Sequence, residues 1–537
     1  MKKYLVLLSA AVMAFASCND KNKGNGNGDE GGENPAIEEV AIDGLVYQKG
    51  EIYYLGDGDQ NFLTPKGDYT LDASKTYILR GWVYVQTESK LTIPAGTVVK
   101  GLKSNELKGS ALIIEPGGQI FAQGTADKPI VFTSDQPAGG RKPGDWGGLV
   151  ICGKAKNNQN IMQIEGGPRT THGGTDDADN SGVLSYVRIE FAGYPFQTDQ
   201  EINGLTLGSV GSGTKIDHVQ VSYSNDDSFE WFGGAVNCSH LVAYHGWDDD
   251  FDTDNGFSGK LQFLLGVRHP KVADQSLSNG FESDNNSSAS KISPYTAAAF
   301  CNVTLVGPIG QDADFINESG SGKYIDAGTL FPNNGSRVGQ FQAGIQIRRN
   351  SRISLTNSLI MGYPVGLIVE DDKVAGTEEF AQANNTLGNI FFAGYTNNAA
   401  EAAFDNSAKG SAPILGSDCN KVWKDWSGTW DYGTAKFTGN AGTKSVSHAI
   451  ALANGNRTAT VAELLLDSPV SVKADYSGNT GQNYGPKSGS PLVDPSFTVP
   501  AGFDASGNGF SGAFKSNSAA DNWTVGWTNF DPQNTVY

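Results

Sequence analysis

Short hydrophobic segments recur along most of this chain, and their spacing is the feature that most limits its fold. Each is rich in Val, Ile, Leu or Phe and ends at Gly, Asn or Asp, as in PIVFTS at 129–134 and IDHVQVSY at 216–223. From residue 200 onward the internal alignments fall at offsets of about 21 to 25 residues, a length that fits one coil of three short strands. The aligned segments are VSYS at 221 with VAYH at 242, NGF at 255 with NGF at 279, and AGIQI at 343 with VGLIV at 365.

The repeat predicts an all-β fold, a parallel β-helix over residues 76–400. Alternate residues of each coil point inward, where Val, Ile, Leu and Phe of successive coils stack. A β-sandwich is the alternative, but it requires longer alternating strands and hairpin turns of the Asn-Gly type, which are not systematic here. Residues 37–75 are predicted to form an N-terminal cap.

The last part of the chain, residues 401–537, has a different pattern and is predicted to be a mixed, partly helical C-terminal cap. Residues 445–455 and 460–468 show helix-like apolar spacing. Five of the nine tryptophans lie here, which fits a cap over the last coil or, as the alternative, an aromatic platform for sugars.

The N-terminus carries an export signal. Lys2 and Lys3 precede an apolar run that ends at Ala16, Ser17 and Cys18. We expect residues 1–17 to be a lipoprotein signal peptide and Cys18 to be acylated; a simple secretory signal cleaved near Ala16 is the alternative. Residues 18–36 hold no aromatic or β-branched side chain, so they are predicted to be a flexible acylated tether.

The composition of the chain limits which kinds of partner it can bind and which kinds of scaffold it can form. The chain has 39 Lys and Arg against 58 Asp and Glu, a formal charge of −19, which argues against binding to nucleic acid. Five cysteines in 537 residues exclude a disulfide scaffold, and the six histidines show no metal-ligand spacing in the sequence.

Acidic residues concentrate at 216–259, where no Lys or Arg occurs. In an extended segment Asp248, Asp250, Asp252 and Asp254 would share one side, and the 21-residue offset would place Asp227 beside Asp248. Carboxylates so close repel one another, and a divalent cation relieves that repulsion. We therefore expect a bound Ca²⁺, with a solvated acidic turn as the alternative. The expected ligands are Asp226, Asp227, Glu230, Asp248, Asp249, Asp250, Asp252 and Asp254.

Aromatic residues and arginines near these acids suggest further roles. Trp231, Trp247 and Phe257 alternate with the acids, as expected for a sugar-stacking groove or for core aromatics. Arg348 and Arg349 are candidate bases for a polysaccharide lyase, or they neutralise nearby acids such as Glu282, Asp284 or Glu370.

A hydrolase would instead need a pair of acids, for which Asp227 and Asp249 are the candidates. No complete lyase or polygalacturonase motif is present in the sequence.

Four stretches carry a resemblance to a known family: GDWGGLVICGKA at 144–155, INGLTLGSVGSGTKIDHVQVSYSNDDSFEWFGG at 202–234, AYHGWDDDFDTDNGFSG at 243–259 and NWTVGWTNFDP at 522–532. They resemble Bacteroidetes outer-membrane lipoproteins with a pectin-lyase-like β-helix. The resemblance implies a right-handed helix and an outer-membrane, cell-surface setting, often beside TonB-dependent transporters. It implies no established activity.

Three functions are consistent with these features. The first is a lipid-anchored surface protein that binds or presents a ligand, such as a glycan, as an accessory to an outer-membrane transporter. The second is a calcium-dependent polysaccharide lyase or hydrolase, and the third is a structural surface protein.

Overall fold

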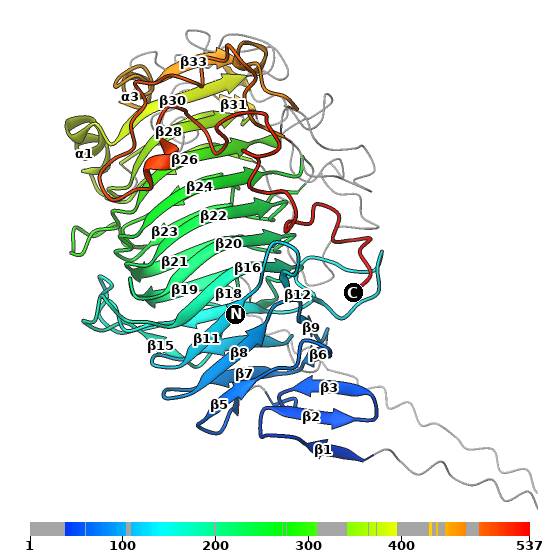
Figure 1. Cartoon of the computed structure of the whole chain (residues 1–537). Helices are drawn as coiled ribbons and strands as arrows, with labels where there is room; N and C mark the ends of the chain where they lie inside the picture. Colours follow the sequence, from blue (N-terminus) through cyan, green and yellow to red (C-terminus); the bar gives the residue numbers. More distant parts are fainter. Residues whose placement is uncertain are drawn as a thin grey trace, which may run out of the picture. The chain divides into compact units, whose positions relative to one another are not determined.

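Alternating aliphatic and polar residues build two large sheets that share one core (Figure 1). The computed structural model describes residues 38–59, 61–103, 109–197, 200–270, 272–274, 276–308, 341–363, 365–371, 373–394, 429–431, 436–438, 446–468 and 483–537. Residues Glu39–Tyr537 form one unit, and the prediction for Cys18 lies outside the described residues.

Sheet B contains one strand from each coil, and its strands are parallel. It comprises β4 (Phe62–Leu63), β7 (Trp82–Val85), β10 (Ala111–Ile114), β13 (Gly148–Cys152), β19 (Leu205–Val210), β21 (Phe229–Gly234), β23 (Phe251–Asp254), β25 (Phe281–Ser283), β27 (Ala343–Ile347) and β29 (Val365–Val369). Phe229, Phe251 and Phe281 stack inward on successive strands, with ring centroids 5.5 and 5.4 Å apart. The structure thus confirms a mostly β fold of stacked parallel coils.

Sheet A forms the rest of each coil. It comprises β1 (Glu39–Ala41), β2 (Val46–Lys49), β3 (Ile52–Leu55), β5 (Asp68–Thr70), β6 (Thr76–Leu79), β8 (Lys90–Pro94), β9 (Val98–Gly101), β11 (Gln119–Gln123), β12 (Ile130–Ser134), β16 (Gly182–Glu190), β20 (Lys215–Ser222), β22 (Asn237–Tyr244), β24 (Lys260–Val267), β26 (Ala299–Val306), β28 (Ser354–Met361), β30 (Leu387–Gly394) and β33 (Arg457–Thr460). The strands β11 and β12 both pair with the single long strand β16, so sheet A covers two sides of each coil.

A bend in each long strand joins these two sides. One residue per strand has a positive φ, between 48° and 60°, and these residues lie opposite one another on seven successive strands. We call them the corner column: Tyr186, His218, His240, Phe263, Asn302, Asn357 and Asn389. The bend interrupts alternation, so the corner residue and the one before it both face outward, as in the burial pattern of β20 and β22.

The two ends of the helix differ. At the first coil β1 and β2, and β2 and β3, pair in antiparallel fashion. Parallel pairing begins with β3, which pairs with β6, so the parallel coils start before residue 76. At the last coil β33 pairs in parallel with β30, while α1 (Thr377–Asn384), α3 (Val446–Ala451) and the 3-10 turn η2 (Val461–Leu464) lie nearby.

Three short antiparallel pairs and one further 3-10 turn complete the described elements. These are β14 (Met162–Gln163) with β15 (Thr171–His172), β17 (Pro195–Gln197) with β18 (Gln200–Glu201), β31 (Thr429–Asp431) with β32 (Lys436–Thr438), and η3 (Ala505–Gly507). No described helix has the length and apolar character needed to cross a membrane.

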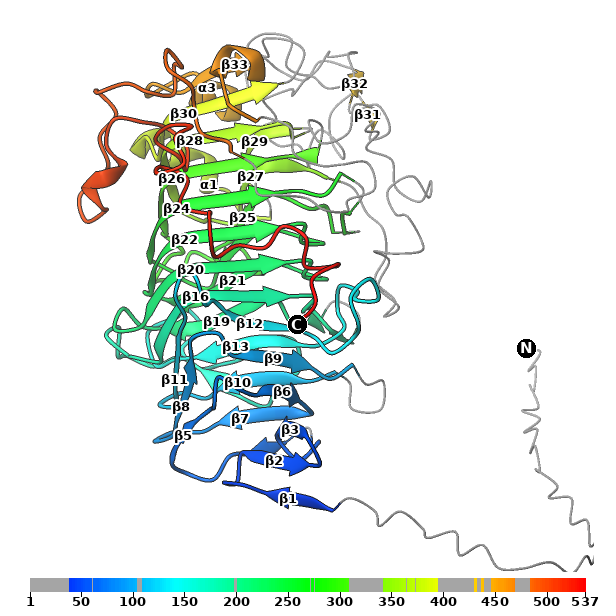
Figure 2. The same ribbon diagram turned by 45° about the vertical axis from the view of Figure 1, so that its right-hand side comes forward.

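Residues 483–537, which we call the C-terminal strap, run back along the outside of sheet A (Figure 2). The strap therefore lies along the side of the β-helix, whereas β33, α3 and η2 of the predicted cap region lie at its last coil. Side-chain amides on sheet A hold its backbone at 2.7–3.1 Å. The bonded pairs are Asn357 with Thr498, Gln262 with Asp504, and Gln220 with Asn529.

The observed register corrects two of the three sequence alignments. Ala343 does pair with Val365, as the 22-residue offset predicts. Val221 pairs with Ala243, so that offset is one residue longer than the alignment suggests. Phe251 pairs with Phe281 because the connection between β24 and β25 lengthens that coil.

Candidate functional site

Three carboxylates form a line on the outer face of sheet B, which we call the acidic row. Glu230, Asp252 and Glu282 are register partners on β21, β23 and β25. Neighbouring strands of a sheet lie about 4.8 Å apart, so each side chain stacks directly on the next. They face outward because the adjacent phenylalanines on the same strands face the core.

A second set of side chains stacks in the turns that precede these strands. Asn203, Asp227, Asp249 and Asn279 occupy equivalent positions, and each Oδ1 accepts a hydrogen bond from the backbone N–H of the next coil. The distances are 3.1 Å to Asn203, 2.8 Å to Asp227 and 3.0 Å to Asn279. Asp227 and Asp249 thus hold successive coils together with one oxygen each and keep the second oxygen for another partner.

Two groups of carboxylates come close enough to hold a metal ion. Asp226, Asp227 and Asp248 form one group, and Asp227, Glu230 and Asp252 form the other, with ligand atoms all within 4.8 Å of one another. Oδ1 of Asp248 and Oδ1 of Asp252 are buried and have no hydrogen-bond partner among the described residues. Oxygen ligands at this spacing suit Ca²⁺, which binds six to eight oxygens at about 2.3–2.6 Å.

The electrostatics of the cluster disfavour its ionised form without a cation. Burial raises the pKa of these carboxyls well above the usual value, and neighbouring carboxylates raise it further. The groups affected are Asp227, Glu230, Asp249, Asp252 and Asp254. Burial, followed by the charge of Asp274, raises the pKa of Asp248 to about 7.

Two arginines neutralise one end of the acidic row. Arg348 donates from Nε to Asp284 at 2.9 Å and contacts Glu282, and Arg349 Nη1 lies 2.6 Å from Asp284. Burial lowers the pKa of Arg348, but the adjacent carboxylates outweigh it and hold that pKa well above its usual value. A base must release its proton near the working pH, so these contacts favour the neutralising role over catalysis.

Asp250 lies apart from the other acids. It forms an ion pair with Arg268 at 3.0 Å, both side chains are fully buried, and the Tyr363 hydroxyl lies 3.3 Å away. Burial raises the pKa of Asp250 to about 6, against the opposing effect of Arg268. The expectation that Asp248, Asp250, Asp252 and Asp254 share one side is wrong, because only the last two lie on the strand β23. Arg268, rather than a metal, partners Asp250.

The predicted aromatic ligands are all in the interior. Trp231, Trp247 and Phe257 have no exposed surface. Trp231 stacks on Phe257 with ring centroids 5.5 Å apart inside the β-helix. The sugar-stacking expectation for these three rings is therefore corrected: they pack the core, the alternative that their pattern also allowed.

A groove of about 940 Å³ opens beside the acids, between residues 159–169 and residues 287–288. Asp254 and Phe232, which are register partners on sheet B, contribute to its lining. The rest of the lining combines apolar residues with amides, hydroxyls and charged groups. The apolar residues are Met162, Ile164 and Pro168, and the polar ones include Gln159, Gln163, Glu165, Arg169, Asn255, Ser287 and Ser288. The polar groups of this lining can form hydrogen bonds with a polyhydroxylated ligand.

Sequence reasoning missed two parts of this site. Glu282 and Asp284 were expected only as partners of the arginines, because they lie 28 and 30 residues after Asp254, the last acid of the predicted cluster. Asn203 and Asn279 belong to the same stack of turn residues as Asp227 and Asp249. Both asparagines precede a glycine, at 204 and 280, and this shared pattern could have identified them from the sequence.

Comparison with known proteins identifies the fold family. The family model described as "Pectate-lyase like beta helix domain" matches residues 63–431, more than half of the chain. No curated protein and no solved structure matches the chain.

Proposed function

The chain belongs to the pectate-lyase like β-helix domain family. From the geometry of its acidic residues we propose that it is a calcium-dependent ligand-binding protein. One observation carries the proposal: carboxylates from successive coils bring their oxygens within 4.8 Å of one another beside an open groove. A divalent cation offsets their repulsion, and its remaining coordination positions are available to hydroxyl or carboxylate groups of a ligand.

The chemistry of the groove supports a glycan as the ligand. Gln163, Asn255 and Ser288 line the groove and offer amide and hydroxyl groups that pair with sugar hydroxyls. Arg169 and Glu165 add charges of both signs. An acidic sugar would fit best, since its carboxylate could bind both Arg169 and the cation.

The cellular setting is also part of the proposal. Acylation at Cys18 and the tether at 18–36 would hold the β-helix at the outer-membrane surface, where it would deliver its ligand to a TonB-dependent transporter. The sequence pattern of the signal and the family resemblance support this setting. Cys18→Ser should release the protein from the membrane fraction; full retention of this variant would place the anchor elsewhere.

Binding of acidic and neutral polysaccharides to the immobilised protein, with Ca²⁺ and with a chelator, tests the function. We expect binding that needs Ca²⁺, that Asp252→Asn abolishes, and that the exposed-surface control Glu51→Gln retains. Calcium-independent binding, or none, would contradict the proposal.

The same incubation tests the lyase or hydrolase alternative. New reducing ends, or absorbance from an unsaturated uronide, would replace the binding function with a catalytic one. The ion pairs of Arg348 and Arg349 lead us to expect neither product.

A further inference from the structure

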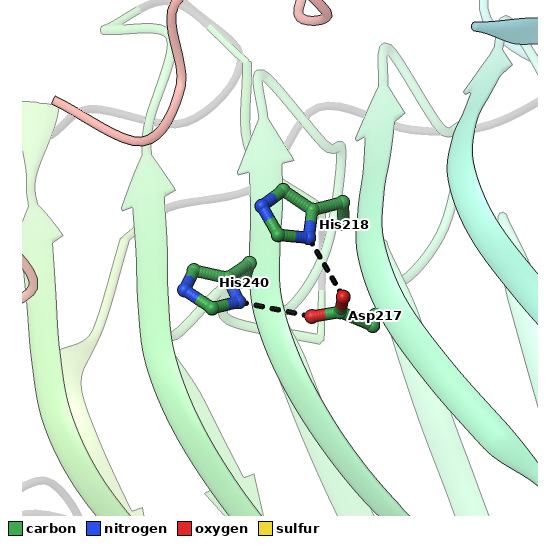
Figure 3. A group of neighbouring side chains, drawn as sticks. All are labelled: Asp217, His218 and His240. Carbon is green, nitrogen blue, oxygen red and sulfur yellow. Dashed lines mark hydrogen bonds and ion pairs between the residues drawn. The ribbon is translucent and has the colours of Figure 1, made fainter. Parts of the chain in front are cut away.

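Two histidines and an aspartate converge on the outer face of sheet A (Figure 3). Asp217 and His218 lie on β20 and His240 on β22. His218 Nδ1 is 2.9 Å from one oxygen of Asp217, and His240 Nδ1 is 2.9 Å from the other. All three side chains are mostly buried, with 14–24% of their surface exposed.

The corner column explains why these residues meet. His218 and His240 occupy its second and third positions, with φ of 54° and 53°. Because the bend interrupts alternation, Asp217 points outward beside His218 instead of into the core. Ser239, the register partner of Asp217, donates a hydrogen bond to the same carboxylate at 2.7 Å.

Aromatic stacking explains why rings occupy these positions, but it does not explain why two of the rings are imidazoles. Tyr186, His218, His240 and Phe263 stack in order, with centroids 4.3, 4.2 and 5.0 Å apart. Tyr and Phe satisfy the stack at its two outer positions, so stacking alone does not require histidine at the two inner ones. Only those two inner rings have nitrogens facing a carboxylate.

One nitrogen is poorly satisfied by hydrogen bonding. His218 Nδ1 is buried and, although near Asp217, makes no well-aligned hydrogen bond among the described residues. Its contact with the Asp217 carboxylate is therefore close, but its geometry does not fit a well-aligned N–H···O hydrogen bond. A cation between the nitrogen and the carboxylate would satisfy both groups.

We propose that Asp217, His218 and His240 form a binding site for a divalent transition metal such as zinc. Two imidazole nitrogens and a carboxylate are a ligand set that Zn²⁺, Co²⁺ and Ni²⁺ prefer, whereas Ca²⁺ prefers oxygen alone. The candidate ligand atoms lie within 4.8 Å of one another, close enough to reach one ion. Three protein ligands leave at least one coordination position for water or another small ligand.

Binding requires a small rearrangement. The two imidazole rings are nearly parallel, at 17°, so their Nδ1 lone pairs run side by side and do not meet at one point. One ring must turn out of the stack to coordinate the metal, and His240 has the more exposed side chain of the two. Trp527 and Trp523 of the strap meet the ring edges at 5.4 and 5.2 Å and limit that motion.

This site is independent of the proposed calcium site. It lies on sheet A, whereas the acidic row lies on sheet B. Its ligands include nitrogen, so excess Ca²⁺ should not compete for it. The two sites can therefore be titrated separately in the same protein.

Calorimetric titration of Zn²⁺ into the metal-free, full-length mature protein, made without a histidine tag and kept in millimolar Ca²⁺, tests the proposal. We expect one Zn²⁺ per chain. His240→Phe and His218→Tyr, which copy the residues of the adjacent coils, should each weaken binding at least about a hundredfold, since losing even a ligand's supporting partner costs about 10–100-fold. Phe263→Leu shortens the stack without removing a ligand and should bind like the wild type.

Cobalt gives a second readout. Co²⁺ bound by nitrogen and oxygen should produce visible absorption bands in the wild type and in Phe263→Leu, and Zn²⁺ should displace them. Melting curves without metal identify any variant that fails to fold. If the wild type binds neither ion, or if folded His240→Phe binds Zn²⁺ as tightly as the wild type, the proposal is overturned and the three residues form only a hydrogen-bonded support.

Discussion

The outer faces of sheets A and B belong to the same coils, but their outward polar side chains have different surroundings. On sheet A, several outward polar side chains are amides that the strap covers; Gln220 and Asn529, for example, exchange hydrogen bonds at 2.8 and 2.7 Å. On sheet B, outward groups at the same height are carboxylates such as Glu230 and Asp252, stacked on one another beside an open groove. Covered amides stabilise the fold, whereas stacked like charges cost stability unless a ligand binds.

The largest effect should come from loosening the covered face. Trp527 of the strap is almost fully buried against Tyr186 and His218 of sheet A, so Trp527→Ala should cost about 3–5 kcal/mol of unfolding free energy in a denaturant titration. The Ca²⁺ affinity of this variant should remain that of the wild type, because the acidic row lies on the other sheet. A parallel loss of Ca²⁺ affinity would show that the faces are coupled.

A change on the charged face should act only when calcium is present. A ligand at a hundredfold excess over its Kd stabilises the native state by about 2.7 kcal/mol. Wild-type protein should gain that much with Ca²⁺, and Asp252→Asn should gain little. Without Ca²⁺ the variant should be at least as stable as the wild type, since it removes one of the repelling charges. Equal stabilisation of both proteins by Ca²⁺ would rule out Asp252 as a ligand.

The pH dependence of stability should differ with and without calcium. The acids have raised pKa values in the fold, about 7 for Asp248, whereas unfolded carboxyls titrate near about 4. The folded state therefore holds more protons in this range, and metal-free stability should fall as the pH rises from about 5 to 8. Each unit by which one pKa is raised contributes about 1.4 kcal/mol.

Bound Ca²⁺ favours the ionised carboxylates and should flatten this decline. Melting temperatures measured across the range, with Ca²⁺ and with chelator, test the difference. Metal-free stability that rises with pH would contradict the electrostatics of the cluster.

The smallest effect should come from an exposed charge pair outside both faces. Lys156 and Asp177 lie 2.5 Å apart, with about half of each side chain exposed. Lys156→Ala should change the unfolding free energy by no more than about 1 kcal/mol. A larger loss would mean that exposed charge pairs also contribute strongly to the unfolding free energy, so that the acidic row would not be exceptional in its effect on stability.

The sequence predicted the fold well because the short hydrophobic segments remain recognisable even where the connections between them differ in length. It predicted the acidic region for a similar reason, since a run of acids without a base is visible in any register. Individual partners were harder: a shift of one residue exchanges inward and outward positions. The alignment offset of 21 placed Asp227 beside Asp248, and their carboxylates do lie within 4.8 Å of each other, but the offset missed Asp249, whose backbone N–H donates to Asp227.

The same shift concealed the histidine pair. An offset of 21 places His218 opposite Ser239, and only the true offset of 22 places it opposite His240. The roles of Trp231 and Trp247 were equally hidden, because bends and turns break the alternation that would assign a side. The strap could not be foreseen, since its contacts with sheet A join residues far apart in the sequence, such as Gln220 and Asn529.

The central claim is that the charged face of sheet B is a cation site. Crystals grown with Ca²⁺ and measured for anomalous scattering test it most directly. The account predicts a peak among Asp227, Glu230 and Asp252, or among Asp226, Asp227 and Asp248, at about 2.3–2.6 Å from their oxygens. A well-ordered map with no peak among these carboxylates at saturating Ca²⁺ and neutral pH would contradict it.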